Sequence, residues 1–182
     1  NEALKEAQEE GDEPRQIAIC LNAARWYGQE LGHAEYAGPY YDQILSLDPG
    51  NVAALLQRAD LYRDTQQWDQ MAESLNQLLS VTQEASVLAN ANVQLGELSE
   101  RHFGDPERAI QYYERCLSMC PHSGNAAHNR LLALNYSIAH SRDQVTAAHK
   151  AWGQDIRARA LSAVASSGVG MTESFSNSRC LS

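Results

Sequence analysis

The chain has 182 residues, of which 43% are hydrophobic, so it can bury a core and has the usual size of one domain. Its formal net charge of -9 argues against nucleic acid and membrane surfaces as partners, because both need clustered Lys and Arg. No apolar run approaches the roughly 20 residues that cross a bilayer, and the opening NEALKEAQEEGDEP lacks the apolar centre of a secretory signal. We therefore expect a cytoplasmic or nuclear protein.

The first segment, residues 1–16, is expected to form a partial helix and a linker. EALKEAQEE has a helical composition but no preceding cap, and the chain begins with Asn1 instead of Met. We therefore expect the chain to start inside a longer protein. The main helical region is expected to cover residues 17–160.

A pattern of small and large residues recurs within this region. AGPYYDQILSLDP has Ala37, Tyr41, Ile44 and Pro49 at offsets 0, 4, 7 and 12, and AIQYYERCLSMCP repeats these offsets. MAESLNQLLSVTQ repeats the first three offsets and begins 34 residues after Ala37, which is the period of a tetratricopeptide repeat. The small residue lets the second helix of a pair approach the first, and the larger residue one turn later fills the gap.

A first helix is expected before each of these second helices, and four such segments are visible: residues 17–30, 52–64, 86–101 and 125–138. Asp105 followed by Pro106 predicts a helix start, and Ser141 with Gln144 predicts a capping box before the final helix. The sequence therefore predicts an all-α fold, a tetratricopeptide-repeat superhelix of about four antiparallel helix pairs, with the first and last pairs atypical.

The last segment, residues 161–182, has a different composition. It holds seven serines, two glycines and few large apolar residues, which is typical of disorder. We expect a disordered C-terminal tail there.

One part of the chain carries a more specific resemblance. AIQYYERCLSMCPHSGNAAHNRLLALNY, followed by VTAAHKAWG, resembles the last repeat and exit helices of SPINDLY-type protein O-glycosyltransferases, members of the O-GlcNAc transferase-like family. In that family an Asn-Arg-Leu-Leu-x-x-Asn-Tyr segment, here residues 129–136, precedes an Ala-His-basic-x-Trp-Gly segment, here residues 148–153. The detailed resemblance covers residues 109–153; before them only the general repeat pattern is shared.

The resemblance implies a repeat region that selects protein substrates for a sugar transferase. The family's catalytic domain follows the Trp-Gly helix, but the 30 residues after Trp152 do not contain its Gly-Tyr-x-Ser-x-Asp-Phe-x-x-His type of opening. We therefore expect no catalytic residue in this chain. A Gly-rich phosphate loop and a nucleophile with a positioned base are also missing from the sequence, so no cofactor is expected.

Carboxamide side chains mark the predicted binding face. The first helices of such a superhelix line its concave face, so positions two and six of each point toward a bound chain. These positions hold five carboxamides: Asn90 and Asn125 at position two, and Gln57, Gln94 and Asn129 at position six. Each offers a donor and an acceptor, so a ladder of them can hold the backbone of an extended peptide. The resemblance implies the same role, because the family uses an asparagine ladder.

Two carboxylates, Asp60 and Glu97, are expected one turn further along the same face, where they would favour a basic or hydroxyl-rich peptide. The alternative interpretation is that all these side chains are solvated polar residues without a binding role.

A metal site is not expected, although Cys116, Cys120, His122 and His128 are ligating residue types. Their spacing is not a usual zinc pattern, and Cys116 occupies a core position of its repeat. Two functions remain open. The chain is either the substrate-recognition segment of a SPINDLY-like transferase of O-fucose or O-GlcNAc, or an independent repeat adaptor. Extended segments of client proteins are the expected partners, and self-association through the repeats is also left open.

Overall fold

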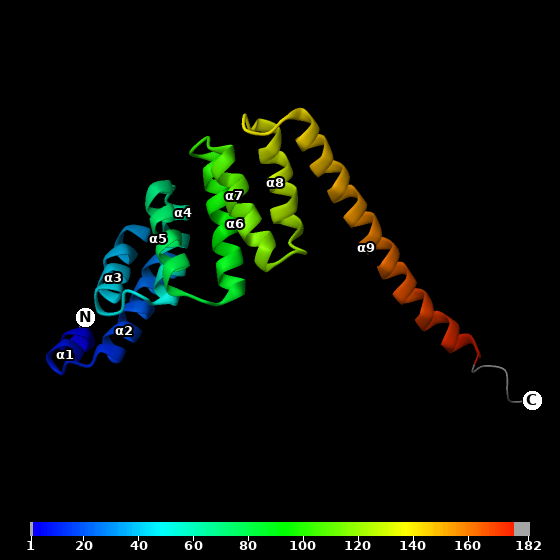
Figure 1. The fold of residues 1–182 in the computed structure, drawn as a ribbon. Coiled ribbons are helices and arrows are strands. Elements are labelled where there is room, and N and C mark those ends of the chain that lie inside the picture. Colours follow the sequence, from blue (N-terminus) through cyan, green and yellow to red (C-terminus); the bar gives the residue numbers. More distant parts are fainter. Residues whose placement is uncertain (1, 177–182) are drawn as a thin grey trace, which may run out of the picture.

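The computed structural model describes residues 2–176, and these residues form helices and connecting turns without a strand (Figure 1). The helices follow one another along an elongated array: α1 (Glu2–Glu9), α2 (Glu13–Arg25), η1 (Trp26–Glu30), α3 (Ala34–Leu47), α4 (Val52–Asp64), α5 (Trp68–Val81), α6 (Ala85–Arg101), α7 (Pro106–Met119), α8 (Gly124–Tyr136) and α9 (Arg142–Ser176). The all-α superhelix predicted from the sequence is confirmed.

Each helix packs mainly against its neighbours in the chain. Helix α2 packs extensively against α3, α4 against α5, and α6 against α7, while α3·α4, α5·α6 and α7·α8 contacts join successive pairs. Contacts restricted to neighbours are typical of repeat proteins, in which each unit buries its apolar face against the next.

The predicted core positions are buried. Ala37, Met71 and Ala109 each lie in the interior, as do the residues four and seven positions after them. Helices α6 and α7 approach each other closely, since an ideal Cβ built on Gly96 would stand 2.4 Å from Cε1 of Tyr113. The lack of a side chain at Gly96 therefore lets the tyrosine ring pack directly on the α6 backbone.

Helix starts follow the predicted capping chemistry. The Asp105 carboxylate accepts a hydrogen bond of 2.9 Å from the backbone N–H of Arg108, and Pro106 occupies the first helical position. At the start of α9, Gln144 N–H donates to Ser141 Oγ at 3.3 Å, and Ser141 N–H donates to Gln144 Oε1 at 2.7 Å. This reciprocal pair is the capping box expected from the sequence.

The N-terminal region is more regular than expected. Residues 2–9 form helix α1, whose Leu4 and Ala7 are buried, and α2 begins at Glu13 instead of Ile17. The Gln16 side chain fixes the contact by donating from Nε2 to the carbonyl of Ala7 at 3.1 Å. Residues 2–16, for which the sequence predicts a partial helix and a linker, thus form helix α1, a short turn and the start of α2.

The C-terminal helix departs from the array. A second core cluster is formed by buried residues of α6, α7 and α8. Val145, Ala148 and Trp152 of α9 pack on it, and beyond them α9 diverges from α8 (Figure 1). The last pair is therefore splayed, which agrees with its predicted atypical character. No helix among residues 2–176 combines the length and apolarity needed to cross a membrane.

Helix α9 runs into the segment for which the sequence predicts a disordered tail. Residues 161–176 continue α9, whereas residues 177–182 lie outside the described range. Four alanines between positions 158 and 165 favour helix, and extending an existing helix adds a hydrogen bond for each residue fixed.

Candidate peptide-binding face

The predicted carboxamides lie on the first helices α4, α6 and α8. Their exposure divides them into two groups. Gln57, Gln94 and Asn129 are half-buried, whereas Asn90 and Asn125 are exposed. None of the five residues is fully buried.

Hydrogen bonds already occupy one end of each half-buried carboxamide. Tyr41 OH donates to Gln57 Oε1 at 3.3 Å, which joins α3 to α4. Gln94 Nε2 donates to Asn90 Oδ1 at 3.2 Å within α6, and Asn129 Nδ2 donates to Glu97 Oε1 at 3.2 Å between α8 and α6. The structure therefore arranges the carboxamides as separate pairs with neighbouring residues, and not as one continuous chain of hydrogen bonds.

The two predicted carboxylates are also engaged. Arg63 donates to Asp60 Oδ1 at 2.5 Å, and Glu97 accepts the bond from Asn129. Burial first, and the charge of Asp60 second, raise the pKa of Tyr41, which places Asp60 near the Tyr41–Gln57 contact. Because Arg63 offsets the charge of Asp60, this face offers a basic peptide less attraction than the sequence alone indicates.

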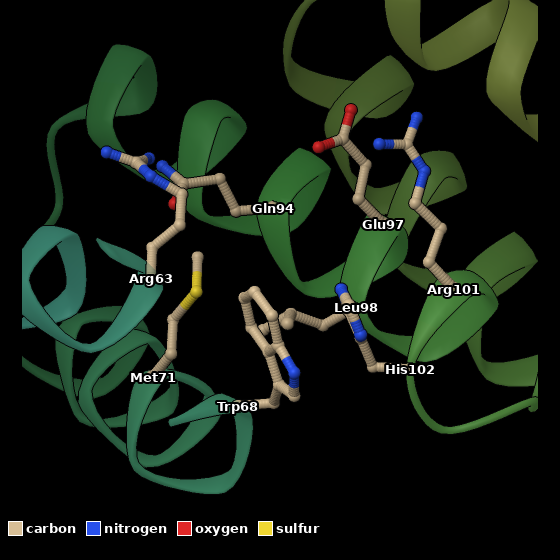
Figure 2. A pocket seen from close by; sticks show the side chains of 8 residues that line it. All are labelled: Arg63, Trp68, Met71, Gln94, Glu97, Leu98, Arg101 and His102. Carbon is tan, nitrogen blue, oxygen red and sulfur yellow. The ribbon is translucent and has the colours of Figure 1, made fainter. Parts of the chain in front are cut away.

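A pocket of about 200 Å³ opens between α4, α5 and α6, next to the carboxamides (Figure 2). We call it the Trp68 pocket, and define it by its lining residues Arg63, Trp68, Met71, Gln94, Glu97, Leu98, Arg101 and His102. The rings of Trp68 and His102 stack with centroids 3.8 Å apart and an angle of 18° between their planes. Met71 and Leu98 are buried and give the pocket an apolar wall.

One polar atom in this wall is unsatisfied. The Gln94 side-chain oxygen Oε1 is enclosed by the protein and has no hydrogen-bond partner. A buried acceptor without a partner lowers stability, because it has lost its water without replacement. In the close-up view, the side chains of Gln94 and Arg63 stand on one side of the pocket, and those of Glu97 and Arg101 on the other, with Trp68 between them (Figure 2).

Sequence reasoning found Gln94 and Glu97 but missed the rest of the pocket. The helical spacing of Trp68 is typical of a core residue, but Trp68 is half-buried with its indole against His102. The helical spacing places Trp68 at the start of α5 and His102 at the end of α6, but it does not show that the two rings meet. Only the stacking of one pair on the next brings them together.

The environment of Cys116 is that of a core residue. Cys116 is buried in the second core cluster, and burial raises the pKa of its thiol, while Cys120 is half-buried. A raised pKa keeps a thiol protonated and poorly nucleophilic. Within residues 2–176, no three His, Cys, Asp or Glu side chains are grouped in a way that could hold a metal ion.

Comparison with known proteins agrees with this architecture. Residues 53–81 and residues 93–127 each match the tetratricopeptide repeat family. The fold is a tetratricopeptide-repeat array. Crystal structures of MamA share this fold, and one of them aligns over 88% of both chains with a TM-score of 0.64 and 19% identity.

Two further similarities are to glycosyltransferases. A segment of 45 residues, 25% of this chain, is 49% identical to a protein of Oryza sativa subsp. japonica named probable UDP-N-acetylglucosamine–peptide N-acetylglucosaminyltransferase SPINDLY. A mutant O-GlcNAc transferase of Thermobaculum terrenum aligns over 79% of this chain with a TM-score of 0.52 and 20% identity. The aligned regions make up 5% of the rice protein and 26% of the bacterial one, so the chain corresponds to a small part of either enzyme.

Proposed function

We propose that this chain is a peptide-binding repeat module that holds extended segments of client proteins along α4, α6 and α8. The observation that carries the proposal is the placement of Gln57, Gln94 and Asn129 on successive first helices, each half-buried. An extended peptide exposes backbone donors and acceptors at regular intervals, which carboxamides can match with little regard for its side chains.

We further propose that the module is the substrate-recognition segment of a SPINDLY-like protein O-glycosyltransferase. The 49% identity over 45 residues with the rice protein supports this link, and so does the fold shared with the bacterial transferase. Transfer of O-fucose or O-GlcNAc would then be carried out by a catalytic domain of the parent enzyme. The repeats would contribute binding and orientation of the client, in the cytoplasm or nucleus.

The peptide-binding proposal can be tested with a displayed library of random 12-residue peptides. The triple variant Gln57→Ala, Gln94→Ala and Asn129→Ala should capture peptides at least about tenfold less well than the unchanged chain, because it removes the groups that meet the peptide backbone. The control triple variant Gln70→Ala, Gln83→Ala and Gln111→Ala removes three exposed carboxamides elsewhere and should capture peptides normally. Equal capture by both variants would mean that the predicted carboxamides are solvated polar residues without a binding role.

The transferase link needs a separate test. The rice relative should be incubated with client extract and labelled GDP-fucose or, separately, labelled UDP-N-acetylglucosamine. An excess of this chain should lower the labelling of clients, because it competes for the same segments, whereas the Gln57, Gln94 and Asn129 triple variant should not. If the unchanged chain binds peptides but leaves labelling unaffected, it is an independent adaptor.

A further inference from the structure

We propose that the Trp68 pocket holds one large apolar side chain of the bound peptide. This inference rests on the proposed peptide-binding function and adds sequence selectivity to it. The pocket and the carboxamide face share Gln94, so a peptide held along α4 and α6 passes the pocket entrance.

The size of the pocket limits its occupant. An apolar protein cavity of about 150 Å³ accepts a benzene molecule. The Trp68 pocket, at about 200 Å³, therefore has room for a single phenylalanine, leucine or methionine side chain, but not for two. An alanine side chain would leave most of the volume unfilled and would lose the contacts with Met71 and Leu98.

The charges around the pocket exclude ionised side chains. Arg101 lines it, so a lysine or arginine of the peptide would face like charge at close range, whereas Arg63 is paired with Asp60. A carboxylate would have to leave water and lie against Met71 and the stacked Trp68 ring. Glu97, the anionic residue in the lining, already accepts a hydrogen bond from Asn129. A neutral apolar side chain meets none of these costs.

The test uses the random peptide library and then one captured peptide. Peptides enriched by the unchanged chain should share Phe, Leu, Met or Ile at one position. Replacement of that residue by Ala should weaken binding about tenfold or more, since such discrimination is usual for an apolar pocket. In a spectrum of the ¹⁵N-labelled chain, the peptide should shift the indole N–H resonance of Trp68 and leave those of Trp26 and Trp152 in place.

One variant with a matched control tests the pocket itself. His102→Ala removes the ring stacked on Trp68 and should reduce the apolar preference, whereas His122→Ala, at another exposed histidine, should not.

The outcomes distinguish the two proposals. If the chain captures no peptide at all, the proposed function itself fails. If it captures peptides through the carboxamides but selects no apolar residue, or if Trp68 does not respond, the pocket inference is overturned and the binding function stands. An apolar preference that survives His102→Ala in full would likewise place the selective contact elsewhere.

Discussion

The substitution Gly96→Ala offers a sharp test of how the third helix pair is packed. Gly96 lies in the interior of α6, where alanine would ordinarily stabilise the helix by about 1 kcal/mol. Its Cβ would, however, stand 2.4 Å from Cε1 and 2.8 Å from Cδ1 of Tyr113. Both distances are far below normal carbon contacts of about 3.5 to 4 Å, so either the ring or the helix must move.

Tyr113 has little freedom to yield. Its side chain is fully buried, and its hydroxyl donates to Glu100 Oε2 at 3.2 Å, so a shift of the ring would disturb both the core and this hydrogen bond. Overpacking of this kind costs about 1 to 3 kcal/mol, and the closeness of the contact indicates the upper part of that range. After the gain in helix propensity is subtracted, we expect Gly96→Ala to lower the free energy of unfolding by about 1 to 2 kcal/mol.

Urea unfolding followed by far-ultraviolet circular dichroism measures the effect. Gly153→Ala is the control, because a Cβ at that helical position meets no atom within 4 Å and should stabilise the chain by about 0.5 to 1 kcal/mol. In a chain that already carries Tyr113→Leu, Gly96→Ala should lower the free energy of unfolding by less than it does in the unchanged chain, because the clash is then relieved. If Gly96→Ala proves as stable as Gly153→Ala, the packing of Tyr113 on α6 described above is wrong.

Three other predictions follow from single contacts. Gln94→Met should leave the free energy of unfolding unchanged or raise it by up to about 1 kcal/mol in urea melts, because it removes an unsatisfied acceptor; a loss larger than that of Gln111→Met would contradict this. Burial raises the pKa of Cys116, so alkylation followed by mass spectrometry should label it much more slowly in the native chain than in urea, and equal rates would refute its burial. Burial opposes ionisation of Glu107, but hydrogen bonds from its own backbone N–H and from Ile138 N–H outweigh this and lower its pKa. The contribution of Glu107 to folding stability is therefore complete above its pKa in the unfolded chain, and it is lost as the pH falls through its pKa in the folded chain. The Ile138 amide resonance should therefore shift on acidification below pH 4.5, and Glu107→Ala should abolish the transition.

The fold was predictable because its determinants are local and periodic. Offsets of four and seven residues from Ala37, Met71 and Ala109 specify one buried face of a helix, and the 34-residue step specifies its stacking on the next pair. Helix α4 accordingly has the predicted bounds, Val52–Asp64. The direction of α9 was not predictable, because it depends on which face of that helix finds a partner beyond Trp152.

The candidate site was predictable only as a set of positions. The repeat register places Gln57, Gln94 and Asn129 on first helices, but their hydrogen-bond partners come from other elements. Tyr41 is 16 residues from Gln57, and Glu97 is 32 residues from Asn129. Such contacts depend on side-chain rotamers and on the angle between helix pairs, neither of which a one-dimensional pattern encodes.

These internal hydrogen bonds have a consequence for how the face would bind a peptide. Because Tyr41 occupies Gln57 Oε1, the donor Nε2 is the end of Gln57 that remains for a peptide carbonyl. Glu97 holds the donor end of Asn129, so this side chain presents its acceptor Oδ1 to a peptide N–H group. The orientation of these amides is thus set before binding, which reduces the side-chain entropy lost when a peptide is ordered. A face built in this way can favour one direction of the peptide backbone, since it offers a donor at α4 and an acceptor at α8.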